Sequence, residues 1–115
     1  MNFKKILKTF DLHTSKDISV ERLCGIYMED KKDGSFNLVA TDGYTMLIGN
    51  FNIMNDYTSL RKTLASDYKQ YTPQEFTPGV IFLNERKRKL LEVDVFEVYE
   101  DTVKRFGHFP EYKKV

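Results

Sequence analysis

Two Asp-Gly pairs, each set between apolar, β-prone runs, constrain the fold of this chain more than any other feature of its sequence. The pairs are Asp33-Gly34 and Asp42-Gly43. Asp-Gly favours the two-residue type I′ turn of a β-hairpin, because that turn needs positive φ at both central residues and glycine adopts such angles without a Cβ clash. We therefore expect residues 22–53 to form three consecutive antiparallel strands. Within the first strand, Gly25 predicts a bulge or the close approach of another backbone.

The segment before these strands has the period of an amphipathic helix. Residues 3–12 carry apolar side chains at i, i+3, i+4 and i+7, a spacing that places them on one helical face. These side chains are Phe3, Ile6, Leu7 and Phe10. Three lysines fall outside the stripe, namely Lys4, Lys5 and Lys8. A solvated outer face is the usual role of such lysines, and a helix laid along phosphates is the alternative.

The second half of the chain has shorter and weaker patterns. Residues 57–68 carry apolar side chains at helical spacing, and residues 79–83 are predicted to be a short buried strand. Asn84 then caps a second basic helix over residues 85–91. Further on, the sequence is β-prone up to Tyr99, and the pattern that follows favours neither helix nor strand. We expect helix and strand to alternate here without a regular meander.

Composition narrows the class of protein. The 115 residues fit one domain, 1–115, and 41% hydrophobic and 30% charged residues are typical of a globular fold. A formal net charge of +1 gives no global basic field, so any contact with DNA must come from a local patch. The single cysteine excludes a disulfide framework. Without a span-length apolar run or a signal-peptide pattern, we expect a cytoplasmic protein that makes no contact with a membrane.

Side chains that could carry catalysis are sparse. His13 and His108 are far apart, and the sequence has no HExxH, CxxC or glycine-rich phosphate loop. Cys24 has no histidine near it in the sequence and is predicted to be a buried, inert thiol. The sequence therefore favours a non-enzymatic protein without metal or cofactor, although distant residues can still meet in a fold.

Three segments of the chain resemble bacterial sliding clamps, the β subunit of DNA polymerase III. Residues 38–44, LVATDGY, are similar to a clamp strand that ends in Ala-Thr-Asp-Gly and is followed by His or Tyr. Residues 23–29, LCGIYME, resemble the strand that precedes it in the family. Residues 107–115, GHFPEYKKV, resemble a second clamp signature, Gly-x-Phe-Pro-Asp-Tyr-x-x-Val, from the middle domain. The segments occur in the order and at about the spacing of that domain.

The resemblance implies a fold and marks where the chain departs from it. It implies one α+β domain of the sliding-clamp type, with a helix packed on an antiparallel meander. Thr45 and Met46 stand where the family has a basic residue and a leucine. Residues 54–78 resemble an insertion, and residues 92–106 leave room for fewer strands than the family has there. We therefore expect the second half of the domain to be remodelled.

The resemblance also implies two sets of site residues. Basic helices line the DNA-filled hole of a clamp, and the positions that would face DNA here are Lys4, Lys5, Lys8, Arg86, Lys87, Arg88 and Lys89. Clamps also bind short hydrophobic peptides of their partners in a pocket beside the middle domain. The positions that match this pocket are Leu23, Thr41, Gly43, Tyr44, Met46, Pro110, Lys114 and Val115.

These features predict a non-enzymatic role in DNA replication, as a processivity or partner-recruitment module. The partners would be replication proteins that carry clamp-binding peptides, with double-stranded DNA held by a ring that self-association through sheet edges would close. An alternative is a phage or mobile-element protein that imitates one clamp domain and modulates host replication by binding the clamp or its partners. A plain structural domain with an accidental Asp-Gly hairpin is the third reading.

Overall fold

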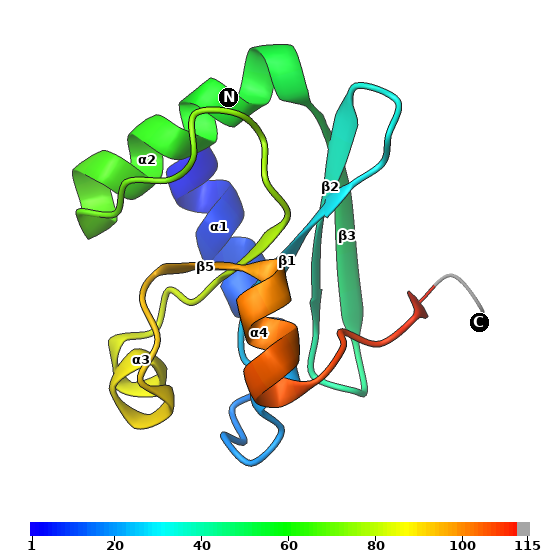
Figure 1. The fold of residues 1–115 in the computed structure, drawn as a ribbon, viewed down its shortest axis with the longest axis vertical. Helices are drawn as coiled ribbons and strands as arrows, with labels where there is room; N and C mark the ends of the chain where they lie inside the picture. The colour runs from blue at the N-terminus through cyan, green and yellow to red at the C-terminus, as the bar shows by residue number, and fades with distance from the viewer. Residues whose placement is uncertain (113–115) are drawn as a thin grey trace.

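A five-stranded antiparallel sheet organises residues 1–112, the part of the chain that the computed structural model describes (Figure 1). In space the strands follow the order β3-β2-β1-β4-β5. Their bounds are Ile26–Asp30 for β1, Ser35–Thr41 for β2, Met46–Asn52 for β3, Gly79–Ile81 for β4 and Phe96–Val98 for β5. The predicted α+β class and the meander of three consecutive strands are both confirmed.

The two hairpin turns contain the predicted Asp-Gly pairs, but they are not type I′ turns. Gly34 and Gly43 have φ of 86° and 93°, whereas neither aspartate has positive φ. Each aspartate instead accepts hydrogen bonds from the backbone N–H groups that follow the glycine, as in the 2.8 Å bond from Tyr44 N to Asp42 Oδ1. The side chain thus closes a wider loop. In the β2–β3 turn Gly43 has positive φ, and in the β1–β2 loop both Gly34 and Lys32, at 63°, have it.

The first strand begins later than predicted. A short 3₁₀ turn, η1, occupies Glu21–Leu23, and β1 starts only at Ile26. Between them the backbone passes very close to β4: a Cβ added to Gly25 would lie 2.4 Å from Cγ1 of Val80. The predicted close approach at Gly25 is therefore confirmed, and its cause is the pairing of β1 with β4 rather than a turn of the meander.

Helices cover both faces of the sheet (Figure 1). On one face lie α1, Phe3–Asp11, and α2, Thr58–Tyr68, which a π-helical turn, η2 Ile53–Tyr57, precedes. Their buried residues join the main core with the inward side chains of the strands. On the other face lie α4, Tyr99–Phe106, and residues 107–112, here called the C-terminal tail. The remaining helix, α3, Glu85–Leu91, follows β4.

The helices of this fold are short. Within residues 1–112, no helix has both the length and the apolar character that crossing a membrane requires.

Candidate functional site

The β2–β3 turn and the C-terminal tail meet around one residue, Leu23. Leu23, Val39 and Phe109 form a buried apolar cluster on the outer face of the sheet. On the turn side, a Cβ placed on Gly43 would lie 3.9 Å from Cδ1 of Leu23. The fold therefore brings together the two segments that carry the clamp-like signatures. We call this region the hairpin–tail surface; it consists of Leu23, Thr41, Gly43, Tyr44, Met46, Ile48, Phe109 and Pro110.

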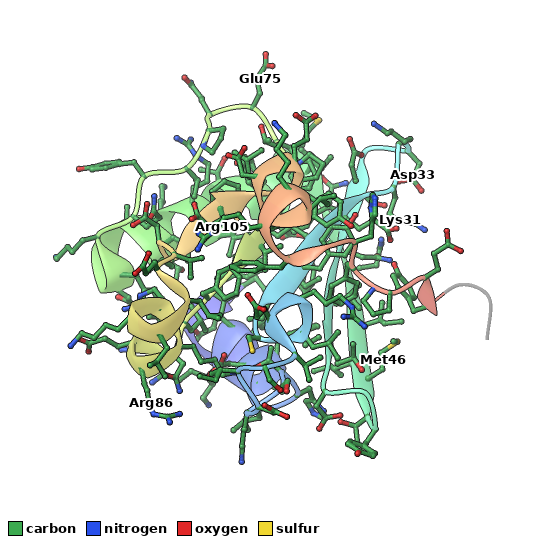
Figure 2. All side chains as sticks on the ribbon, turned by 60° about the horizontal axis from the view of Figure 1, so that its bottom comes forward. Lys31, Asp33, Met46, Glu75, Arg86 and Arg105 are labelled. Atoms are coloured by element: carbon green, nitrogen blue, oxygen red, sulfur yellow. The ribbon has the colours of Figure 1, made fainter. Side chains whose placement is uncertain are left out.

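Strand register places the exposed apolar residues on the same face as the tail. Met46 pairs with Thr41, and Ile48 pairs with Val39, the residue that Phe109 covers. Directly opposite residues of an antiparallel pair point to the same side of the sheet. Figure 2 shows Met46 projecting outward from β3. Met46 and Ile48 are 40% and 46% exposed, so the tail leaves an apolar margin of this face uncovered.

The turn that borders this margin is fixed by hydrogen bonds of its own. The hydroxyl of Thr41 donates to the carbonyl oxygen of Thr45 at 2.6 Å and accepts from the N–H of Gly43 at 3.1 Å. Backbone N–H donation from Thr45 and Tyr44 lowers the pKa of Asp42. Thr41 is buried, so within the hairpin–tail surface its role is to shape the turn rather than to contact a ligand. Tyr44, in contrast, is 96% exposed at the tip.

The tail is anchored to the sheet by aromatic and polar contacts. The N–H of Phe109 donates to the Tyr99 hydroxyl at 2.9 Å, and the Tyr27 ring lies against both rings at 4.7 and 4.9 Å. Burial raises the pKa of Tyr27 above its ordinary value. Further along, the Tyr112 hydroxyl donates to Oε1 of Glu29. These contacts fix the tail, in which Pro110 is half-buried, against β1 and β2. No pattern in the sequence singled out Tyr27 or Tyr99. Lys114 and Val115, which were also matched to the pocket, lie outside the described residues.

The basic residues of α1 and α3 differ in exposure. Lys4, Lys5 and Lys8 are exposed on the outer side of α1, as predicted. On α3, Arg86 and Lys89 are exposed, and Figure 2 shows Arg86 pointing away from the protein. Lys89 forms an ion pair with Glu85 at 3.2 Å, which lowers the positive charge that this helix presents.

The placement of Lys87 on a DNA-facing surface is wrong. Its side chain is only 5% exposed, and its ammonium donates to Thr14 Oγ1 at 2.8 Å and to the carbonyl oxygen of Cys24 at 3.3 Å. Loss of hydration in this setting lowers its pKa. Helical periodicity is the physical reason, because residues four apart share a face and Leu91 is also buried. The spacing to Leu91 was the signal that could have revealed it.

Arg88 is also unsuited to the predicted DNA contact. Its Nη1 donates to the carbonyl oxygens of Phe82 and Leu83, at 3.0 and 2.5 Å, and the side chain is half-buried. It therefore ties α3 to the end of β4.

Cys24 is buried, and burial raises the pKa of its thiol, which disfavours the nucleophilic thiolate. Among residues 1–112, no three His, Cys, Asp or Glu side chains are grouped in a way that could hold a metal ion.

No protein-family model matches this chain, and neither the curated proteins nor the solved structures contain a significant match. The functional argument therefore starts from the geometry of the chain itself.

Proposed function

We propose that this protein is a non-enzymatic, clamp-like recruitment module of DNA replication, whose hairpin–tail surface binds a short hydrophobic peptide of a replication protein. One observation carries the proposal. Two motifs that are distant in the sequence, and that both resemble clamp signatures, converge on Leu23. Folding alone would explain an Asp-Gly turn, but a turn and a tail that leave Met46 and Ile48 exposed on the same face of the sheet offer a surface for a ligand.

The chemistry of the surface fits an apolar peptide. Met46 and Ile48 offer contact area, and methionine adapts its shape to different ligands. Gly43 has no side chain, so a ligand backbone can approach the turn closely. The surface is open rather than enclosed, so a bound peptide stays partly hydrated. We therefore expect roughly micromolar affinity, which corresponds to about −8 kcal/mol.

The proposal also includes contacts between DNA and the exposed basic side chains of α1 and α3. Lys4, Lys5 and Lys8, together with Arg86 and Lys89 of α3, would contact the phosphates of double-stranded DNA. Such contacts are independent of base sequence and weaken steeply with salt. In a ring they need only be weak, because topology would hold the DNA.

Fluorescence polarisation with a labelled peptide that carries a hydrophobic clamp-binding motif tests the recruitment role. Wild-type protein should bind the peptide but not a scrambled version of it. Met46→Asp should abolish binding, because it places a charge on the apolar surface. Leu12→Asp is the matched control, since Leu12 is also exposed but lies at the end of α1. A flat wild-type titration, or equal binding by Met46→Asp, contradicts the proposal.

A further inference from the structure

Strand β3 forms an open edge of the sheet. It lies at the end of the strand order, and within residues 1–112 it pairs with β2 alone. The N–H of Ile53 donates to the carbonyl oxygen of Gly34 at 3.0 Å, so the odd-numbered backbone groups of this segment point toward β2. Because orientation alternates along a strand, the even-numbered groups point outward. Asn52 is one of these, and its N–H is occupied by Asp56 Oδ2 at 2.8 Å.

The outward row that remains belongs to Met46, Ile48 and Asn50. Their backbone N–H and C=O groups face away from β2 in the described part of the chain. A row of this kind is a template for another strand. This outward row runs from Met46 to Asn50, and Ile48 is at its centre.

The sequence of this edge lacks the usual protection against strand pairing. Residues 44–55, YTMLIGNFNIMN, contain no charged residue and no proline. Natural edge strands are normally blunted by charges, prolines, bulges or short length. The opposite edge follows this rule, because β5 has only three residues and one of them is Glu97. Strand β3 is seven residues long. The two edges of one sheet therefore differ in that only β5 is protected.

We infer that β3 pairs with β3 of a second copy of this chain, antiparallel and about a two-fold axis at Ile48. This register opposes Ile48 with Ile48 of the second copy and Met46 with Asn50, and it uses the whole outward row. No like charges meet, and the exposed side chain of Ile48 gains an apolar neighbour. A second copy is favoured over a foreign strand because the outward row of residues 46–50 is complementary to itself in this register.

The pairing has a defined geometry. The contact is isologous, so two copies use up both β3 edges and this contact closes at a dimer; a ring around DNA would need a second, different contact. A two-fold axis perpendicular to the sheet keeps α1 of both copies on one side of the joined sheet and both hairpin–tail surfaces on the other. Lys4, Lys5 and Lys8 of both copies therefore lie on the same face of the dimer. The dimer uses the backbone edge of β3 and makes no use of the tail, but the side chains of Met46 and Ile48 belong both to this contact and to the hairpin–tail surface.

Light scattering coupled to size exclusion tests the pairing on the full chain. Wild-type protein should reach twice the 13.6 kDa monomer mass as its concentration rises. Ile48→Lys should remain at the monomer mass, because two lysines would oppose each other at the axis. Leu12→Lys, at an exposed site on α1, should dimerise like wild type. Circular dichroism should show that both variants are folded. A wild-type monomer at every concentration, or a dimer that survives Ile48→Lys, overturns the inference.

Cross-linking tests the register and the occupant. Cys24 is the one cysteine of the chain and is buried, so Ile48→Cys provides a single accessible thiol. A short bis-maleimide should join two Ile48→Cys chains. It should not join two Lys62→Cys chains, because Lys62 is exposed on α2, away from the axis. Equal cross-linking of both variants, or binding of an extended peptide at this edge without self-association, refutes a second copy as the occupant.

Discussion

The two basic helices carry similar runs of charge but use them differently. On α1 all three lysines are exposed, and the inner face is formed by Phe3, Leu7 and Phe10. On α3 a basic residue, Lys87, occupies the inner face beside Leu91. Both helices begin with an asparagine that accepts a backbone N–H bond. The comparison shows that a run of lysine and arginine is not by itself a binding surface, because the helical period decides which charges reach solvent.

Among the changes that compare the two helices, charge reversal at the positions proposed to face DNA should have the largest effect, and the property it changes is binding to duplex DNA. Binding to duplex DNA should be lost when Lys4, Lys5, Lys8, Arg86 and Lys89 are all changed to glutamate. Reversal on α1 alone should weaken binding more than reversal on α3 alone, because Lys89 is already paired with Glu85. Electrophoretic mobility or anisotropy measurements at several salt concentrations provide the test. Binding that survives all five changes, or that depends on base sequence, contradicts the assignment.

Removal of the buried lysine should cost stability rather than binding. Lys87→Ala leaves Thr14 and the Cys24 carbonyl without their donor and opens a small cavity, so we expect a loss of about 2–4 kcal/mol in the free energy of unfolding. Lys5→Ala, on exposed α1, should change it by less than about 0.5 kcal/mol. Urea denaturation measures both. Equal losses of unfolding free energy for the two substitutions would contradict the conclusion that α3 buries a lysine and α1 does not.

The pH dependence of the free energy of unfolding is a second test of the burial of Lys87. The folded pKa of Lys87 is lowered by burial, so the unfolded chain binds the extra proton between that pKa and the ordinary value of 10.5. In this range the Lys87 contribution raises stability as pH rises. The stability of Lys87→Met relative to wild type should therefore fall as pH increases toward 10.5. A pH-independent difference between the two proteins would show that Lys87 titrates normally.

The two helix caps should give the smallest effects. Asn84 Oδ1 accepts from Lys87 N at 3.1 Å, and Asn2 Oδ1 accepts from Lys5 N at 3.3 Å near the chain start. Asn84→Ala should cost about 1 kcal/mol, and Asn2→Ala about 0.5 kcal/mol. Glycine at either position is the control and should cost only a few tenths of a kcal/mol. A larger loss at Asn2 than at Asn84, measured by urea denaturation, would reverse the expected order.

Local patterns predicted the parts of the fold that local forces determine. The meander, α1 and the Asn84-capped α3 follow from turn residues, helical spacing and a cap. The start of β1 was predicted too early, because the close packing of Gly25 on Val80 is a tertiary contact. Helix α4 was missed because its apolar stripe is short: Tyr99, Val103 and Phe106 stand at i, i+4 and i+7 in a helix of eight residues that directly follows a strand.

The candidate site was only partly visible in the sequence. The resemblance pointed to Met46 and to the tail, but not to the aromatic contacts that hold the tail. Tyr27 and Tyr99 are far apart in the chain, and only the sheet brings their rings together with Phe109. Ile48 was not singled out either, because its exposure depends on the register of β3 against β2.

The most direct test of the central claim is a titration of isotope-labelled protein with the hydrophobic peptide, followed by amide chemical shifts in two-dimensional NMR. The account predicts that the shifts concentrate at Gly43, Tyr44, Met46 and Phe109, and that α3 is unaffected. Shifts confined to other surfaces, or none at saturating peptide, would contradict peptide recruitment by the hairpin–tail surface.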